Sequence, residues 1–436
     1  MDISDIQWLQ KVVPLAYKAL KTLSSCPKRL CPTSTSQLLS SSPLIEQQEE
    51  TAVPESSSKR RRKIQTLHSG RQRRIWVRKE NLSRDVDGLF ATAFYNARNQ
   101  EEFCMRTGMT PQVFDMLFSL VGEQLNKNSI RRPISPECRL FLTLVYLTNV
   151  ESIQDLSKAF EMGSSTVRAV VPETSEVLWN TLEPAFMPQP NWSNIVEGYQ
   201  QTWEVPHCLG AVDAKLLDVD YKGANDIILL ASCDTNLNFT CIDIATVTDA
   251  VDNQLHWHYD FGSQLLDLQL VNILPPEPLQ SGKDQKDQEN FVYTFIADSS
   301  FPMREHLITP YKSRYLDFDQ FHFNRHLSRA LAGSIDKAFN LLLSRWRLLS
   351  QPLRQSPSNA EKIVRAAVVL HNFVKQHEET YCPVDYLEEL SMCPIQQKVP
   401  NSLLSSCEQR LVNCNATIRL QDCMKNLLSA KLESTA

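Results

Sequence analysis

Apolar residues recur at helical spacing between residues 81 and 200. Thr110 precedes Pro111 and Ser135 precedes Pro136, and apolar residues three or four positions apart follow each pair. A hydroxyl side chain before a helix accepts a hydrogen bond from a backbone amide, and proline fits the first helical position. The pattern therefore predicts an all-helical region over residues 81–200.

A helix-turn-helix is predicted inside this helical region. Residues 152–160 carry apolar positions on one helical face, Gly163 supplies the turn, and a second helix begins at Ser164 and is expected to end near Pro172. Such motifs contact DNA with the exposed start of the second helix. The expected contacts here are Ser164, Ser165, Thr166 and Arg168. An ordinary helical hairpin is the alternative, because only one of these residues is basic.

The apolar pattern changes to strand length after Trp203. Short apolar runs bounded by polar residues cover 208–213, 227–233, 239–247 and 291–297. Helical spacing returns over 334–349 and 360–376. Strands followed by packing helices predict an α/β or α+β domain, which we place at residues 201–380.

The two ends of the chain carry weaker patterns. Residues 1–24 are predicted to form an amphipathic helix, interrupted at Pro14. Residues 25–80 form a Ser-rich and then basic linker, whose low apolar content predicts disorder. Residues 381–436 form an irregular tail with a possible helix near its end.

The net charge of −5 hides an uneven distribution of charge. Ten Lys or Arg and no acid lie between Lys59 and Lys79, so the remainder carries 35 basic against 50 acidic residues. The densest part is Lys59, Arg60, Arg61, Arg62 and Lys63. Such a cluster is typical of a nuclear localisation signal or a nucleic-acid contact, with a solvated basic linker as the alternative. We therefore expect a nuclear protein, with a cytoplasmic pool allowed.

The cysteines and histidines show no spacing typical of a metal site or of a catalytic site. The twelve cysteines are scattered without C-x-x-C or zinc-finger spacing, and Cys233 and Cys241 lie in apolar runs that favour reduced, buried thiols. His322 and His326 are four positions apart, but neighbouring phenylalanines favour a packed loop there. His371 follows an apolar residue and is expected to be a core histidine. No apolar run is long enough to span a membrane.

Three aspartates stand out against this background. Asp213 and Asp298 end predicted strands, and Asp336 lies near the start of a predicted helix. Each alone is explained by a strand-end or helix-capping role. Together, carboxylates on paired strands and a packed helix are what divalent-metal phosphoryl transfer requires.

The motifs around these acids resemble those of one family. Cys208-Leu-Gly-Ala-Val-Asp213 resembles the first-Asp motif of PIF/Harbinger transposases and the nucleases derived from them. Ala297-Asp-Ser-Ser-Phe-Pro-Met303 is similar to the second-Asp motif, and Ile335-Asp-Lys-Ala-Phe339 is similar to the helix that carries the third acid. Val369-Leu-His-Asn-Phe373 resembles the closing helix. The resemblance covers roughly residues 90–378.

This resemblance implies a fold, a site and partners. The fold would be an RNase H-like mixed sheet flanked by helices, after the helix-turn-helix region. Asp213, Asp298 and Asp336 would be the catalytic residues and would bind Mg²⁺ or Mn²⁺ in a DDE-type endonuclease acting on DNA. Related transposases imply a separate Myb/SANT-like DNA-binding partner.

The chain departs from the family pattern at two positions beside these acids. Asp336 stands where the family has Glu, which shortens the ligand by one methylene. Ala214-Lys215-Leu216 keeps only the basic residue of the Gly, basic residue and His that follow the first Asp in the family. Such changes are typical of a domesticated transposase. The alternative is therefore a catalytically inactive nuclear DNA- or chromatin-associated adaptor with the same fold.

Overall fold

The computed structural model describes residues 89–91, 100–127, 133–247, 255–266, 277–278, 290–291, 293–304 and 306–381, with single positions at 399, 404, 421, 422 and 425. The predicted N-terminal helix and the linker with its basic cluster lie outside the described residues, as does almost all of the C-terminal tail. Within the described part, no helix is long and apolar enough to cross a membrane.

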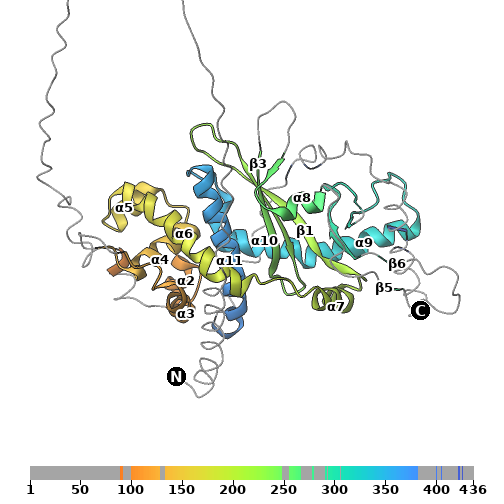
Figure 1. Ribbon diagram of the computed structural model, residues 1–436, viewed down its shortest axis with the longest axis horizontal. Coiled ribbons are helices and arrows are strands. Elements are labelled where there is room, and N and C mark those ends of the chain that lie inside the picture. The colour runs from red at the N-terminus through yellow and green to blue at the C-terminus, as the bar shows by residue number, and fades with distance from the viewer. Residues whose placement is uncertain are drawn as a thin grey trace, which may run out of the picture. The chain divides into compact units, whose positions relative to one another are not determined.

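The first part of the described chain is helical, as predicted (Figure 1). Its helices are α2 (Gln100–Thr107), α3 (Pro111–Val121), α4 (Pro136–Thr148), α5 (Ile153–Ala159), α6 (Ser164–Phe186) and α7 (Trp192–Trp203). The two predicted starts are confirmed: the Thr110 side chain accepts a hydrogen bond from the Val113 amide, and the Ser135 side chain accepts one from the Cys138 amide.

Helix α6 differs from its prediction in where it ends and in the turn that precedes it. It continues through Pro172 to Phe186, so the expected end near Pro172 was wrong. An interior proline removes a backbone hydrogen bond, yet α6 packs along α11 (Pro357–Tyr381) and α4 with Val170, Val171 and Leu178 buried. Tertiary burial therefore overrides the local break. In the turn before α6, Glu161 rather than Gly163 has positive φ.

A six-stranded mixed sheet follows the helices in the order β4-β3-β2-β1-β7-β8. Its strands are β1 (Cys208–Leu217), β2 (Ile227–Cys233), β3 (Phe239–Val247), β4 (Leu255–Trp257), β7 (Thr294–Ala297) and β8 (Leu307–Ile308). Strands β1 to β4 pair antiparallel, whereas β7 pairs parallel with β1 and β8 pairs parallel with β7. A separate short pair joins β5 (Glu277–Pro278) to β6 (Asn290–Phe291).

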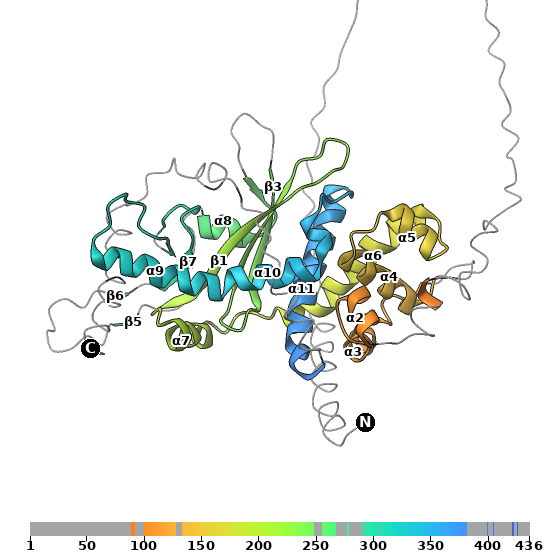
Figure 2. The ribbon, with the colours of Figure 1, turned by 180° about the vertical axis from the view of Figure 1, so that it is seen from behind.

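Helices α8 (Asp260–Leu266), α9 (Phe318–Gly333), α10 (Ile335–Arg345) and α11 complete the fold, with a 3-10 turn η3 (Arg347–Ser350) after α10. The packed loop expected around His322 and His326 was wrong, because both lie in α9. That helix begins with a capping box, in which Asp317 and Gln320 each bond the other's backbone amide. Figure 2 shows α9 and α10 running across one face of the sheet.

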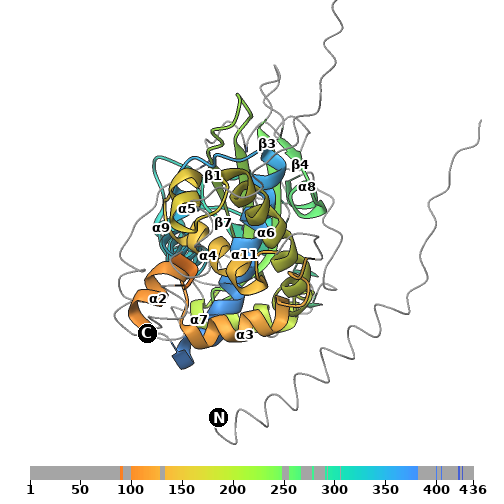
Figure 3. The same cartoon turned by 90° about the vertical axis from the view of Figure 1, so that its left-hand side faces the viewer.

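Side chains of alternate residues in β1 point to opposite faces of the sheet. Ala211 and Leu217 belong to a large core with Phe339 of α10 and with α3, α4, α6 and α11. Val212 and Ala214 belong to a second core with Leu265 and Leu266 of α8. The first core is continuous from the helical region to the sheet. Figure 1 shows α11 between them, and Figure 3 shows the helical region in front of the sheet. The side chains of Asp213 and Lys215 therefore share the face that α10 covers.

The five cysteines that the structure describes are free thiols. Cys233 is buried, as expected, and Cys241 is half-buried. Burial raises the pKa of the Cys208 thiol to about 12 and that of the Cys241 thiol to about 11. These thiols are therefore protonated at neutral pH and are poor nucleophiles.

Candidate active site

Asp213 and Asp298 lie side by side on neighbouring strands. The parallel register of β1 and β7 pairs Ala211 with Ile296 and Val212 with Ala297. The next residue after each strand position is Asp213 on the β1 side and Asp298 on the β7 side. Neighbouring strands are about 4.8 Å apart, and the alternation of side chains sends both carboxylates to the same face. Two of the three predicted site residues are therefore brought together.

Lys215 provides the cation beside this pair. Its Nζ lies 2.5 Å from Oδ2 of Asp213, and the two side chains are only 8% and 13% exposed. The same Nζ lies 5.1 Å from the ring centroid of Phe339 on α10. The sequence predicts no role for Lys215, although a residue two positions from Asp213 in a strand shares its face.

The electrostatics of Asp213 are a balance between burial and charge. Burial raises the pKa of its carboxyl above the ordinary value, the Lys215 ammonium lowers it, and the neighbouring Asp298 carboxylate raises it again. The net shift of the pKa is upward. Burial therefore raises the pKa of this carboxyl by more than the ion pair with Lys215 lowers it.

Asp298 is oriented by the turn that follows β7. Its Oδ1 accepts hydrogen bonds from the backbone amide of Ser300, at 2.9 Å, and from the Ser300 hydroxyl. These bonds fix the carboxyl at the end of the strand. Ser300 is a second residue of the site that the sequence pattern did not predict. A Ser two positions after an Asp is a sequence signal for such a turn.

Asp336 is the second residue of α10 and is exposed. Phe339 is three positions further along, so the two residues share a side of the helix. Because the Phe339 ring contacts Lys215, the first turn of α10 faces the neighbourhood of the carboxylate pair. Among the described residues, however, no three Asp, Glu, His or Cys side chains lie close enough together to hold a metal ion. The assignment of Asp336 as a metal ligand stays a prediction.

Two other acids of the sheet region have structural partners. Asp234 accepts hydrogen bonds from the backbone amide and the side-chain amide of Asn238, at 2.8 and 3.1 Å, and so closes the turn between β2 and β3. Asp243 is fully buried and accepts bonds from the backbone amides of Ile244, Tyr259 and Gly262. Neither carboxylate is available to replace Asp336.

Histidines form no metal site in the described part of the chain. His326 Nε2 donates to the Trp203 carbonyl, and burial lowers the pKa of its ring. His258 bridges Thr246 of β3 and Glu361 of α11 at 3.0 and 3.1 Å. Both rings therefore join neighbouring elements of the fold.

The predicted DNA contacts lie together at the start of α6. Ser164, Ser165 and Arg168 are exposed and Thr166 is half-buried. Helix α5 packs against α6 across the turn at residues 160–163. The exposure of these side chains is compatible with contact to DNA. Their role in DNA binding stays a prediction.

The Asp213–Asp298 pair has the chemistry of a divalent-metal site. Mg²⁺ prefers hard oxygen ligands and is often held by one or two carboxylates together with substrate phosphates. Two carboxylates on one face, one of them buried and with a raised pKa, fit such an ion. The Lys215 ammonium now supplies the positive charge at Asp213.

Comparison with known proteins points to the same part of the chain. Residues 214–372 match the family model described as "DDE superfamily endonuclease", a match that begins one residue after Asp213. "Protein ALP1-like" of Arabidopsis thaliana is 22% identical over 321 residues, which are 67% of this chain and 75% of that protein. "Putative nuclease HARBI1" of Xenopus laevis is 24% identical over 287 residues, which are 64% of this chain and 79% of that protein. No solved structure matches the chain.

Proposed function

We propose that this chain, which belongs to the DDE superfamily endonuclease family, is a domesticated, transposase-derived nuclease that hydrolyses phosphodiester bonds of DNA. The observation that carries the proposal is the register of β1 and β7, which sets Asp213 beside Asp298. The strand order supports an RNase H-like sheet, because the antiparallel strands β1 to β4 are followed along the chain by β7 and β8, which pair parallel.

Each residue near the pair has a part in this proposal. Asp213 and Asp298 would hold Mg²⁺ or Mn²⁺, with Asp336 of α10 as the third ligand. When bound, two such ions would supply an activated water and stabilise the charge on the leaving oxygen. Ser300 orients the Asp298 carboxyl, and Lys215 offsets the Asp213 charge before substrate arrives.

DNA binding is assigned to surfaces outside this pair. Ser164, Ser165, Thr166 and Arg168 at the start of α6 would contact DNA, since three of them are exposed at a helix start. The cluster from Lys59 to Lys63 would direct nuclear import. A Myb/SANT-like protein would supply further DNA specificity, because the acidic remainder of this chain is poorly suited to bind DNA alone.

An inactive nuclear DNA- or chromatin-associated adaptor is the second candidate. Two observations favour it: Lys215 already neutralises Asp213, and Asp336 is exposed and shorter than the family's Glu. An ammonium that stays in place would exclude a metal ion from that carboxylate. The fold and any DNA-binding surface would be retained.

Incubation of the purified full-length chain with supercoiled plasmid and Mg²⁺ or Mn²⁺ separates the two candidates. The nuclease proposal predicts nicking that Asp213→Ala and Asp298→Ala each abolish. Asp218→Asn is the matched control, because Asp218 is an exposed acid just beyond β1. DNA binding without nicking in either metal would instead establish the adaptor.

A further inference from the structure

The three most exposed Phe, Tyr and Trp side chains that the structure describes lie within seven residues of one another at the start of α9. Tyr315 is 89% exposed, Phe318 is 75% exposed and Phe321 is 57% exposed. Phe318 and Phe321 are three positions apart, so both rings lie on the same side of the helix. The opposite side is buried through Phe323 and Leu327. Exposed apolar surface that polar side chains surround is typical of an interaction site.

The exposed side of α9 continues from aromatic to basic side chains. His322 is four positions after Phe318, and the two ring centroids lie 5.7 Å apart. Arg325 and Arg329 are seven and eleven positions after Phe318, a spacing that keeps them on the same helical face, and both are exposed. We call this face the outer α9 surface. It consists of Tyr315, Phe318, Phe321, His322, Arg325 and Arg329.

Positive charge distinguishes this segment from most of the chain. Residues 309–333 contain four Lys or Arg and two Asp, whereas the chain outside residues 59–79 has 35 basic and 50 acidic residues. Arg325 and Arg329 form no ion pair with any residue in the described part of the chain. Their charges are therefore available to an anionic partner.

The two acids of this segment leave it with a net positive charge. Asp317 is the helix cap and accepts a hydrogen bond from a backbone amide of the first turn at 2.7 Å. Asp319 is turned by about 100° from Phe318 around the helix axis, so it lies at the border of the outer α9 surface. Four basic residues against two acids give residues 309–333 a net charge of +2.

Hydrogen bonds hold the backbone that carries the exposed rings. The Asn324 side chain accepts a bond from the Tyr311 amide at 2.8 Å and donates one to the Tyr311 carbonyl at 3.0 Å. The Ser313 hydroxyl donates to the Tyr315 carbonyl at 2.8 Å and accepts from the Tyr315 amide at 3.2 Å. A surface fixed in this way loses less conformational entropy when a ligand binds.

The outer α9 surface lies beside the strands of the carboxylate pair. Helix α9 packs against β1, which carries Asp213, and against β7, which Asp298 follows. Lys312 Nζ lies 3.5 Å from the carbonyl oxygen of Phe301, three residues beyond Asp298. Figure 2 shows α9 next to β1 and β7, on the side of the sheet away from α5 and α6. This surface is therefore separate from the DNA contacts proposed at the start of α6.

We propose that the outer α9 surface binds single-stranded DNA, with unpaired bases stacked on its aromatic rings and phosphates held by Arg325 and Arg329. Exposed rings next to basic groups are the recognition mode of single strands, because every base offers a face for stacking. Phe318 and Arg329 are about 17 Å apart along the helix axis, which is roughly five nucleotides at the spacing of one strand in a duplex.

The choice of this ligand has two reasons. DNA is chosen because the proposed function makes it the substrate, so this inference rests on that proposal. The positive charge favours a polyanion over a second copy of the same surface, since like charges across an interface repel.

Fluorescence anisotropy of the full-length chain with labelled oligodeoxyuridine tests the stacking. Phe318→Ala and Phe318→Leu should each weaken binding about tenfold, because stacking of one base contributes about 1–3 kcal/mol. Phe318→Tyr keeps a ring and should bind like wild type. Met105→Ala is the matched control, because Met105 of α2 is 60% exposed and lies outside this surface. Equal binding by Phe318→Leu and Phe318→Tyr would overturn the stacking.

A hairpin duplex and a salt titration test the remaining parts. Phe318→Ala should change duplex affinity little, and a loss as large as that for oligodeoxyuridine would reject unpaired bases as the ligand. Arg325→Gln should lower the slope of log K against log salt by about 0.7 for the single strand. Arg354→Gln is its control, because Arg354 is an exposed arginine outside α9. Equal slopes in the two variants would exclude the phosphate contact.

Three further results would overturn this surface or separate it from the proposed function. Tighter ring-dependent binding of oligouridine than of oligodeoxyuridine would replace DNA by RNA. Self-association in ultracentrifugation that Phe318→Ala abolishes, with unchanged oligonucleotide binding, would make the surface a contact between copies. Plasmid nicking without ring-dependent binding keeps the nuclease and rejects this surface, whereas ring-dependent binding without nicking keeps this surface and rejects the nuclease.

Discussion

Lys215 is the only described cation bonded to Asp213, and its Nζ lies 2.5 Å from Oδ2 of that carboxylate. The pair is nearly buried, and the Phe339 ring of α10 lies over the ammonium. Any divalent ion that binds Asp213 must share or displace this contact. Lys215 therefore links the stability of the sheet to the chemistry of the carboxylate pair.

Replacing Lys215 by Met should destabilise the fold by about 3 kcal/mol at neutral pH, because a buried carboxylate is left without its partner. The loss should shrink at lower pH, since the pKa of Asp213 rises further without the ammonium and the carboxyl becomes neutral. Urea unfolding of Lys215→Met at pH 7 and pH 5 measures both effects. Asp213→Asn combined with Lys215→Met should recover part of the stability, and equal losses at the two pH values would contradict the buried pair.

Lengthening Asp336 to Glu should raise metal-dependent DNA cleavage by roughly tenfold, because a shift of about an ångström in a ligand can cost that much or more. The change restores the arm length of the family's third acid. Initial nicking rates of Asp336→Glu and wild type provide the measurement, with Asp218→Glu as the control. No gain in Asp336→Glu, together with unchanged nicking in Asp336→Asn, would remove Asp336 from the site.

Removing the charge at the start of α6 should weaken DNA binding without changing stability. Arg168 is exposed, so Arg168→Gln should lower the salt slope by about one while the melting temperature stays constant. Lys222→Gln, in the turn between β1 and β2, is the control for a general loss of charge. Equal DNA affinity of Arg168→Gln and Lys222→Gln would favour the ordinary helical hairpin.

The core histidine should make the fold sensitive to acid. Burial lowers the pKa of His371 to about 4, helped by the nearby charges of Arg345 and Lys375, while its Nε2 donates to the Leu237 carbonyl at 2.9 Å. The unfolded chain takes up this proton near pH 6.5, so the stability is complete above that pH and falls as the pH drops toward 4. The pKa difference corresponds to roughly 3 kcal/mol.

Urea unfolding between pH 7 and pH 4.5 measures this loss. His371→Gln keeps an amide that can donate to Leu237 but cannot take up the proton. Its stability should therefore fall less steeply over the same range. Parallel pH profiles for wild type and His371→Gln would assign the acid sensitivity to other groups.

Local sequence patterns predicted those elements that polar turn residues separate. Strands β2 and β3 have the predicted bounds, because Asp234 follows the first apolar run and Asn238 precedes the second. The core position of His371 and the helix starts at Pro111 and Pro136 are confirmed for similar local reasons. Helix α9 was missed because its phenylalanines face both the core and solvent: Phe323 is buried and Phe321 is exposed.

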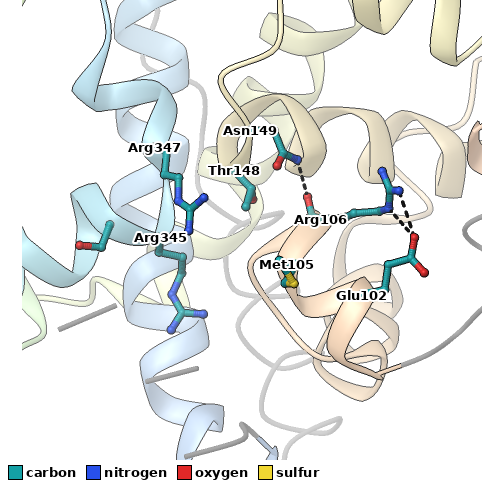
Figure 4. A pocket seen from close by; sticks show the side chains of 8 residues that line it. Glu102, Met105, Arg106, Thr148, Asn149, Arg345 and Arg347 are labelled. Atoms are coloured by element: carbon teal, nitrogen blue, oxygen red, sulfur yellow. Dashed lines mark hydrogen bonds and ion pairs between the residues drawn. The ribbon is translucent and has the colours of Figure 1, made fainter. Parts of the chain in front are cut away.

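Contacts between distant segments could not be predicted from local patterns. The strand-end positions of Asp213 and Asp298 indicated carboxylates at a sheet edge. That they lie side by side depends on the parallel pairing of β1 with β7, which are neighbours in the sheet but far apart in the sequence. The path of α6 beyond Pro172 depends on packing against α11, which lies far along the chain. The pocket lined by Met105, Thr148 and Arg345 likewise joins α2 and α4 to α10 (Figure 4).

The most direct test of the paired carboxylates is the binding of Mn²⁺ to the full-length chain, measured by electron paramagnetic resonance. Wild type should bind Mn²⁺, and Asp213→Asn and Asp298→Asn should each lose most of that binding, whereas Asp218→Asn should keep it. Binding by both Asp213→Asn and Asp298→Asn at the wild-type level, or no binding by wild type, would contradict a metal site at these two strands.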